Sequence, residues 1–456
     1  MLLAWSAGPN ARRVPVCLDS SMRSYAQRRC PVLDATVAVK HRDHGLKEKM
    51  TDFAKLYHQY RNLLLDNVIP FWFRNGIDWT YGGVLSCIRD DGSIASGDKF
   101  IWSQARSVWT FSALYNRIER QPQFLQAAEN SMRFLLAHGR DKKGRWVYQT
   151  DREGRVIEGA TSIYADCFVV YGFNEYYRAT KDEEALSVAR ATLERIRRRV
   201  EEPDFQETAP YPLPLGWRNH GIPMILISVT DELARTAPNR DLDSLTDDYV
   251  QRVMNHFVRP ERKAILEFLT RDYKELPPPA GTFVMPGHAI ECMWFVMRVA
   301  QQRGDLNLIH RAAEVMRWHL ELGWDKEFGG IALSLDIEGH EPYLPHSDMK
   351  VWWPHVEALY GALLAHELTG EPWCLEWYEK VANWTWSHFP AGECGEWHQR
   401  LTRKGNPTSE VVALPVKDPF HLPRAAILIS QLLEQTHPAQ IGCANTQQLP
   451  HPEQTA

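Results

Sequence analysis

A pair of helical patterns that recurs six times constrains the fold more than any other feature of the sequence. One member of each pair is apolar over most of its length, and the other carries a charged stripe. The apolar helices are expected at 102–118, 162–179, 219–235, 286–302, 349–368 and 420–435. The striped helices are expected at 51–73, 122–138, 183–200, 241–258, 306–323 and 372–388. The apolar set belongs inside the fold and the striped set outside.

The links between these helices repeat as well. Links from an inner to an outer helix are polar and short, such as RATKDEEAL and VAQQRGDLNL. Several return links carry hairpin turns, for example Asp-Asp-Gly within 81–94 and Arg-Lys-Gly-Asn within 395–406. Six such pairs predict an all-α fold, an (α/α)6 toroid with short β-hairpins in the loops at one mouth.

The domain organisation follows from where this repeat begins and ends. Residues 50–435 are expected to form one barrel domain. Residues 1–49 lack helical periodicity and are expected to be a disordered extension or an upstream start, with a transit peptide as the alternative. Residues 436–456 are polar and proline-rich, which predicts a disordered tail.

Charge and cysteine usage exclude several classes of protein. Lys plus Arg is 52 and Asp plus Glu is 57, which gives a net charge of −5. Because no long block of like charges occurs, neither a nucleic-acid groove nor a membrane surface is expected as a partner. No apolar stretch is long enough to span a membrane. The cysteines are scattered without a CxxC pair, which is typical of a cytoplasmic protein.

Polar and aromatic residues collect where the inner helices begin, which a toroid brings to one mouth. Charge and imidazole at the start of an apolar helix are costly unless they are paired or used. We therefore expect a polar cavity there. The candidates are Trp102, Gln104, Arg106, Tyr164, Asp166, His220, His288, Glu291, Trp294, Trp353, His421 and Arg424.

Two histidines stand out among these candidates. His288 and His421 begin the fourth and sixth inner helices, so they would enter the cavity from different sides. Glu291 lies three residues after His288 on the same helix face, where a hydrogen bond would raise the basicity of the imidazole. The spacing alone leaves a structural role equally open for both histidines. For Arg106 the alternative is an ion pair with a loop carboxylate such as Asp98.

Other features of the same helices favour a structural role. His355 and Glu357 are interpreted as a structural pair, and neither is expected to be catalytic. Trp352 and Trp353 are about 100° apart on a helix, so only one is expected to face the cavity. His288 with Glu291 forms HxxE without a convincing third ligand, so no metal site is expected. No GxGxxG motif follows a strand and no Walker loop is present, so no built-in nucleotide cofactor is expected either. The GxSxG motif is also absent.

Four ordered motifs give a specific resemblance over about residues 50–435. They are YGG with KFIWSQARSVWTFS, then MPGHAIECMWF, KVWWPHVEAL and KDPFHLPR. On these motifs the chain resembles the N-acyl-D-glucosamine 2-epimerase family, which includes renin-binding protein. The resemblance implies an (α/α)6 barrel enzyme that acts at the reducing end of a sugar.

The resemblance also implies roles for individual residues. His288 and His421 would be the acid–base pair, and Arg106 would hold the sugar oxygen where negative charge develops. Glu291 would orient or assist His288. The substrate-binding residues would be Trp102, Gln104, Tyr164, Asp166, His220, Trp294, Trp353 and Arg424. Disaccharide-acting relatives place Asn where this chain has His220, which argues against a disaccharide substrate.

The expected function is interconversion of N-acyl-D-glucosamine and N-acyl-D-mannosamine by proton removal and return at C2 through an enediolate. The alternatives are an aldose–ketose isomerase of the mannose–fructose type and a D-mannose 2-epimerase. A glycoside hydrolase and a non-catalytic binding protein are more remote. No cofactor is expected to be required. Some relatives respond to ATP as an allosteric activator and some form homodimers, so both remain expectations for this chain.

Overall fold

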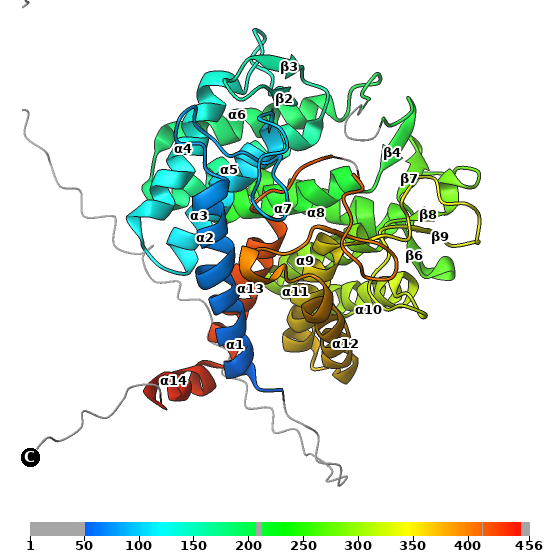
Figure 1. Cartoon of the computed structure of the whole chain (residues 1–456). Coiled ribbons are helices and arrows are strands. Elements are labelled where there is room, and N and C mark those ends of the chain that lie inside the picture. Colours follow the sequence, from blue (N-terminus) through cyan, green and yellow to red (C-terminus); the bar gives the residue numbers. More distant parts are fainter. Residues whose placement is uncertain (1–50, 207–211, 413, 448–456) are drawn as a thin grey trace, which may run out of the picture. The chain divides into compact units, whose positions relative to one another are not determined.

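The computed structural model describes residues 51–206, 212–412 and 414–447. The prediction for residues 1–49 and the end of the predicted tail, 448–456, lie outside the described residues. The chain from Asp52 onward forms one compact unit. Its described part is mostly helical, as predicted (Figure 1).

The buried, apolar helices lie close to their predicted positions. They are buried along most of their length, and we refer to them as the inner helices. They are α3 (Ile101–Arg117), α5 (Ile163–Thr180), α7 (Gly221–Thr236), α9 (Pro286–Arg303), α11 (Trp352–Thr369) and α13 (His421–Thr436).

The amphipathic helices between them are the outer helices. The first is α1 (Phe53–Asn62), which continues through a π-helical stretch, Leu63–Val68, into α2 (Ile69–Asn75). The fourth, α8 (Arg240–Arg252), also ends in a π-helical stretch, Val253–Phe257. The others are α4 (Pro122–His138), α6 (Glu183–Arg199), α10 (Leu306–Gly323) and α12 (Pro372–His388).

The inner helices contact one another in sequence order. α3 packs on α5, α5 on α7, α7 on α9, α9 on α11 and α11 on α13, and α13 packs back on α3. Each also packs on an outer helix, which is the next one along the chain for α3 to α11 and α1 for α13. At the contact of α3 with α5, a Cβ on Gly172 would lie 2.4 Å from the Ala105 carbonyl oxygen, so only glycine allows this approach.

Local sequence explains where several of these helices begin and end. Asp182, Asn239 and Asp305 accept hydrogen bonds from the first free N–H groups of α6, α8 and α10. Gly304 and Gly370, with φ of 67° and 70°, end α9 and α11 in the left-handed conformation that favours glycine.

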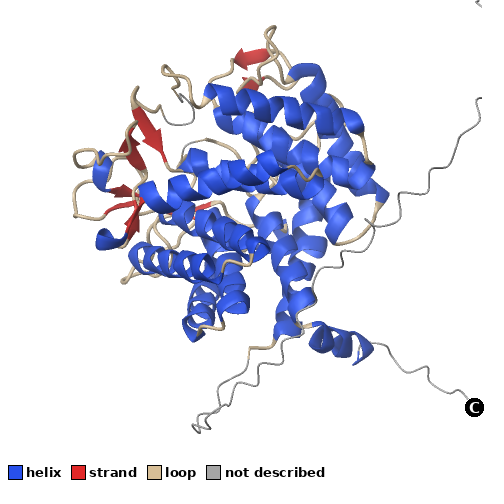
Figure 2. Ribbon diagram, turned by 180° about the vertical axis from the view of Figure 1, so that it is seen from behind, coloured by secondary structure: helices blue, strands red, loops and turns tan. Residues whose placement is uncertain are grey.

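Short antiparallel strand pairs connect neighbouring repeats, and Figure 2 shows them as small segments set among the loops. The strands β1, β4, β8 and β10 each lead into an inner helix and pair with a strand that follows the next outer helix. This pairing places the strands at the N-terminal ends of the inner helices. The bounds are β1 (Lys99–Phe100), β2 (Gln149–Thr150), β3 (Val156–Glu158), β4 (Trp217–Asn219), β5 (Val258–Arg259), β6 (Ala264–Ile265), β7 (Phe268–Thr270), β8 (Phe283–Val284), β9 (Leu335–Asp336), β10 (Lys350–Val351) and β11 (Arg400–Leu401).

A buried ion cluster joins the opposite, C-terminal ends of four inner helices. Arg117 of α3 lies 2.6 Å from Glu175 of α5, and Arg178 of α5 lies 2.6 Å from Glu232 of α7. Arg298 of α9 lies 3.3 Å from the same Glu232 carboxylate. The cluster therefore holds these four helices together at the end opposite to their N-termini.

The prediction of a disordered tail is wrong for part of that segment, because Pro438–Gln447 forms a helix, α14. This helix packs on α1 and α13, and the His437 ring just before it stacks on Phe53 with 3.9 Å between ring centroids. Ile441 is buried there. Apolar contact therefore outweighs the polar composition of the segment. None of the helices in the described residues is long and apolar enough to cross a membrane.

Candidate active site

A cavity of about 230 Å³ opens among the N-terminal ends of the inner helices and the loops that cover them. Its walls are largely apolar, with a few convergent polar groups, as is typical of small-molecule sites. The predicted residues that line it are Trp102, Arg106, Tyr164, His288, Glu291, Trp353 and His421.

His288 lies in the first turn of α9, but the carboxylate that it contacts is not the predicted Glu291. Its Nδ1 atom lies 3.1 Å from Oε1 of Glu267, a residue of the loop before β7. The Glu267 carboxylate is buried and also lies 3.7 Å from His220. Glu291, expected to bond His288, binds Arg424 of α13 instead. Arg424 and Glu291 are both buried, so their pairing compensates two charges that would be costly to leave alone.

His421 has a carboxylate partner of its own on α11. Its Nδ1 atom lies 2.8 Å from Oε1 of Glu357. The guanidinium of Arg424 donates to the same oxygen at 2.7 Å, and the indole of Trp294 donates to the other at 2.8 Å. Glu357, interpreted from the sequence as structural, therefore belongs to the site. His355 is structural, because its Nε2 accepts the Ile331 N–H at 2.8 Å.

Trp353 lies beside both histidines. Its ring centroid is 5.4 Å from that of His288 and 5.7 Å from that of His421. A Cβ on Gly287 would lie 2.5 Å from the Trp353 ring, so the glycine before His288 makes room for the indole. Trp352 lines the cavity as well, against the prediction that only one of the two would. The pair sits at the start of α11, where a short strand joins the helix.

The two histidines differ in their affinity for a proton. Burial by itself opposes charge on His288, but the charge and hydrogen bond of Glu267 raise the pKa of His288 above its usual value. For His421, burial lowers the pKa well below its usual value, and the charge of Arg106 lowers it further. Burial also opposes the charge of Glu267, but His288 and His220 lower its pKa to about 2. The site thus favours a protonated His288 facing a neutral His421.

Arg106 enters the same cavity from α3. Its guanidinium donates to Asp418 at 2.8 Å and lies over the rings of Phe168 and Phe420, at 4.0 and 4.7 Å from their centroids. The alternative prediction, an ion pair of Arg106 with a loop carboxylate, is therefore confirmed, but the carboxylate is Asp418 and not Asp98, which accepts from Gln149. Arg106 is therefore fixed within the cavity wall, where a cation can stabilise negative charge on a bound molecule.

Comparison with known proteins decides the family. The family model described as N-acylglucosamine 2-epimerase (GlcNAc 2-epimerase) matches residues 83–425. The chain belongs to this family. An N-acylglucosamine 2-epimerase of Bos taurus is 31% identical over 379 residues, which cover 81% of this chain and 89% of that protein.

Solved structures share the fold of this N-acylglucosamine 2-epimerase family member. The cellobiose 2-epimerase of Bacillus thermoamylovorans B4167 matches with a TM-score of 0.73 and 20% identity, over 83% of this chain and 99% of that one. A D-mannose isomerase matches with a TM-score of 0.69 and 14% identity, over 85% of this chain and 100% of that one. Identities this low support the fold alone.

Five residues that were predicted to bind substrate do not line the cavity of this family member. Gln104 is fully buried and bonds the backbone of Val84 through both ends of its amide. Asp166 is buried, and burial raises its pKa to about 7. The other three lie behind the catalytic candidates and contact their carboxylate partners. They are His220, beside Glu267, and Trp294 and Arg424, beside Glu357.

Glu267 was not predicted from the sequence, although its sequence neighbours indicate that it is buried. It lies in the apolar stretch AILEFLT, where a carboxylate would be buried unless a cation or imidazole met it. The identity of the partner could not be read from the sequence, because Glu267 and His288 belong to different elements.

Three ligand atoms lie close enough together to suit a metal ion. Those of Glu291, Glu357 and His421 are all within 4.8 Å of one another. The guanidinium of Arg424 already binds both carboxylates. Because this guanidinium already supplies a positive charge between the two carboxylates, the three ligand atoms do not suit a metal ion.

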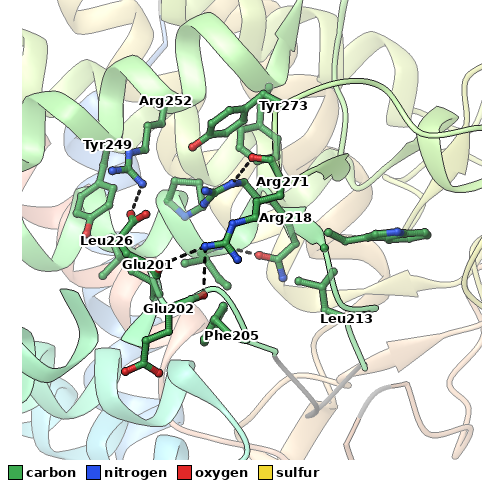
Figure 3. Close-up of a pocket in the computed structure, with 17 residues that line it drawn as sticks. Glu201, Glu202, Phe205, Leu213, Arg218, Leu226, Tyr249, Arg252, Arg271 and Tyr273 are labelled. Atoms are coloured by element: carbon green, nitrogen blue, oxygen red, sulfur yellow. Dashed lines mark hydrogen bonds and ion pairs between the residues drawn. The ribbon is translucent and has the colours of Figure 1, made fainter. Parts of the chain in front are cut away.

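A smaller pocket adjoins the cavity and shares Leu213 and Asn219 with it (Figure 3). Arg271 crosses it and donates to the backbone carbonyls of residues 201–203. Arg252 binds Glu201 on the same side. Of the predicted site residues, none lines this pocket, so the chemistry is placed in the larger cavity.

Proposed function

We propose that the chain is a sugar 2-epimerase that interconverts N-acyl-D-glucosamine and N-acyl-D-mannosamine. The observation that carries the proposal is the pair of imidazole–carboxylate couples, His288–Glu267 and His421–Glu357, at one cavity with Trp353 beside both rings. Membership of the family and the bovine relative support the choice of substrate.

The reaction needs a base, an acid and a stabilised oxyanion. Once the sugar ring opens, the proton on C2 is weakly acidic because it lies next to the C1 carbonyl. His421, whose pKa is lowered, takes this proton, and His288, whose pKa is raised, returns one to the opposite face. The configuration at C2 is thereby inverted.

The electron pair released from C2 forms a C1–C2 double bond and leaves the negative charge on the C1 oxygen, which gives an enolate with the N-acyl group on C2 (an enediolate where C2 carries a hydroxyl, as in mannose). Arg106 lines the cavity and is already oriented by Asp418, so it can stabilise this negative charge without rearranging. Stabilisation by a preorganised cation is often the largest single contribution to such a reaction. The reverse reaction uses the same groups with the two histidines exchanging roles.

The carboxylates of the cavity favour this reading over glycoside hydrolysis. A hydrolase of this kind needs one carboxyl group protonated to act as the acid. The three carboxylates that line the cavity, those of Glu267, Glu291 and Asp418, each lie against a cationic or basic partner. For Glu267, the two neighbouring histidines lower the pKa to about 2, so this carboxylate is not protonated at neutral pH.

The test is incubation with N-acetylmannosamine, N-acetylglucosamine, mannose and glucose in deuterated water, followed by proton NMR. The expected result is loss of the C2 proton signal together with formation of the C2 epimer of an N-acetyl sugar. A ketose product would assign an aldose–ketose isomerase, and exchange with mannose alone a mannose epimerase. Absence of exchange with every sugar would contradict the proposal.

The fold contacts support an (α/α)6 toroid for this enzyme, since the inner helices contact in order and α13 packs back on α3. We further propose that residues 50–435 are its single catalytic domain. A cytoplasmic location, ATP activation, a homodimer and the absence of a required cofactor remain predictions. Measuring the activity at increasing ATP concentrations tests the activation, and the molar mass in solution tests the homodimer.

A further inference from the structure

Arg400 is a second arginine in the cavity, and the mechanism above does not use it. It begins β11 and lines the same cavity as His288, His421 and Arg106. Nη2 of Arg400 donates to the carbonyl oxygen of Leu414 at 2.9 Å. This bond fixes the guanidinium, and because no other hydrogen-bond partner of Arg400's side chain is found among the described residues, its other N–H groups can bind a ligand.

Arg400 differs from Arg106 in its electrostatic surroundings. Arg106 is paired with Asp418 at 2.8 Å. Among the residues that the structure describes, no carboxylate lies within ion-pair distance of Arg400, and its interaction with Asp90 is longer-range. Burial removes the charge of Arg400 partly from water and so lowers its pKa. A desolvated cation without a counter-ion is costly, and a bound anion would remove that cost.

The pairing of β10 with β11 places Arg400 near the catalytic candidates. It lies opposite Val351 in the pair of β10 with β11, and Val351 directly precedes Trp352. The Trp352 ring centroid is 6.3 Å from that of His421. Arg400 therefore belongs to the wall beside the catalytic candidates without being one of them.

We propose that Arg400 binds an anionic substituent of the sugar, so that the preferred substrate is an acidic N-acyl hexosamine. This inference rests on the proposed epimerase function and adds the charge of its substrate. The substituent is a phosphate or carboxylate group on a carbon away from C2. Arginine suits both groups because its planar donors bind two oxygens at once.

The experiment compares three sugars: N-acetylmannosamine, its 6-phosphate and its 6-carboxylate, the uronate. Values of kcat/KM are measured for the native chain, for Arg400→Met and for Lys404→Met. Lys404 is an exposed lysine of the same hairpin and serves as the matched loss of one positive charge. Binding of inorganic phosphate is measured by calorimetry on all three proteins.

The native chain is expected to prefer one anionic sugar over the neutral sugar by about ten- to a hundredfold in kcat/KM, the range of a charge-assisted hydrogen bond. Arg400→Met is expected to abolish that preference, and Lys404→Met to keep it. Phosphate is expected to bind the native chain and Lys404→Met more tightly than Arg400→Met. The anionic sugar that is preferred identifies the substituent as phosphate or carboxylate.

Two results would overturn the inference. One is a native chain that prefers the neutral sugar, and the other is an anionic preference that survives in Arg400→Met. Exchange at C2 of the neutral sugar shows separately whether the epimerase function holds. If no sugar exchanged, the phosphate binding of native chain and Arg400→Met would still decide whether Arg400 forms an anion site.

Discussion

The carboxylate of Glu357 holds Nδ1 of His421 at 2.8 Å across 64 positions of the sequence. Arg424 and Trp294 bind the same carboxylate, so its position does not depend on the histidine alone. With Nδ1 donating to Glu357, the neutral ring has Nε2 as its basic nitrogen. The pair therefore selects the tautomer that a general base requires.

Glu357→Gln is expected to lower kcat by about ten- to a hundredfold, because a charge-assisted hydrogen bond to His421 of about 1.5–3 kcal/mol is lost. KM is expected to change little, since Glu357 does not line the cavity. Steady-state kinetics with N-acetylmannosamine measure both. Glu376→Gln, at an exposed position of the neighbouring α12, is the control, and a rise in KM with unchanged kcat would argue against a positioning role.

Glu267→Gln is expected to change the pH profile of kcat/KM. Activity in the native chain should rise as His421 loses its proton and fall at higher pH as His288 loses its own, above the usual histidine range. The variant removes the charge that raises the pKa of His288. Its alkaline limb should therefore shift to lower pH, while the acid limb stays in place. An alkaline limb that does not move would contradict the assignment of His288 as the acid.

Asp166→Asn is expected to change how stability depends on pH. Burial raises the pKa of Asp166 from 3.8 to about 7 in the folded chain. Because the folded state disfavours the charged form, stability is lost as pH rises from 3.8 to 7, by on the order of 4 kcal/mol. Asn has no ionisable carboxyl group, so the variant lacks this contribution to the pH dependence. Urea unfolding at pH 5 and pH 8 should show a smaller loss in the variant, and an equal loss in both would refute the prediction.

Glu232→Ala is expected to destabilise the fold by about 3–5 kcal/mol, because Arg178 and Arg298 lose a buried counter-ion. Urea unfolding at neutral pH measures the change. Glu129→Ala breaks an exposed pair with Arg133 and should cost less than about 1 kcal/mol. Equal effects of the two variants would show that the cluster does not act as a buried unit.

The helical framework was largely predictable from the sequence. Apolar and striped segments alternate with clear periodicity, and caps such as Asp182 and stops such as Gly304 lie where the helices change. These signals are local, so a single sequence carries them. The π-helical stretch Leu63–Val68 was not predicted, because its apolar pattern does not differ visibly from that of an α-helix.

The partners within the site were predicted less well than its members. His288, His421 and Arg106 reach one cavity as expected, but Glu291 was assigned to His288 because the two are neighbours on one helix. The partner in the structure is Glu267, which belongs to a loop. Spacing along a helix predicts which side chains share a face, and it cannot show what the next element brings against that face.

The sequence by itself determined the inner and outer helices, the polar residues at their beginnings and the family, because these depend on local pattern and ordered motifs. Only the tertiary structure decided which carboxylate orients which histidine and that Arg424 and Trp294 lie behind the cavity. It also decided that Arg400 faces the cavity with no carboxylate of the described residues within ion-pair distance. Those relations join residues tens to hundreds of positions apart. They are determined by packing and charge compensation between elements, which no local pattern encodes.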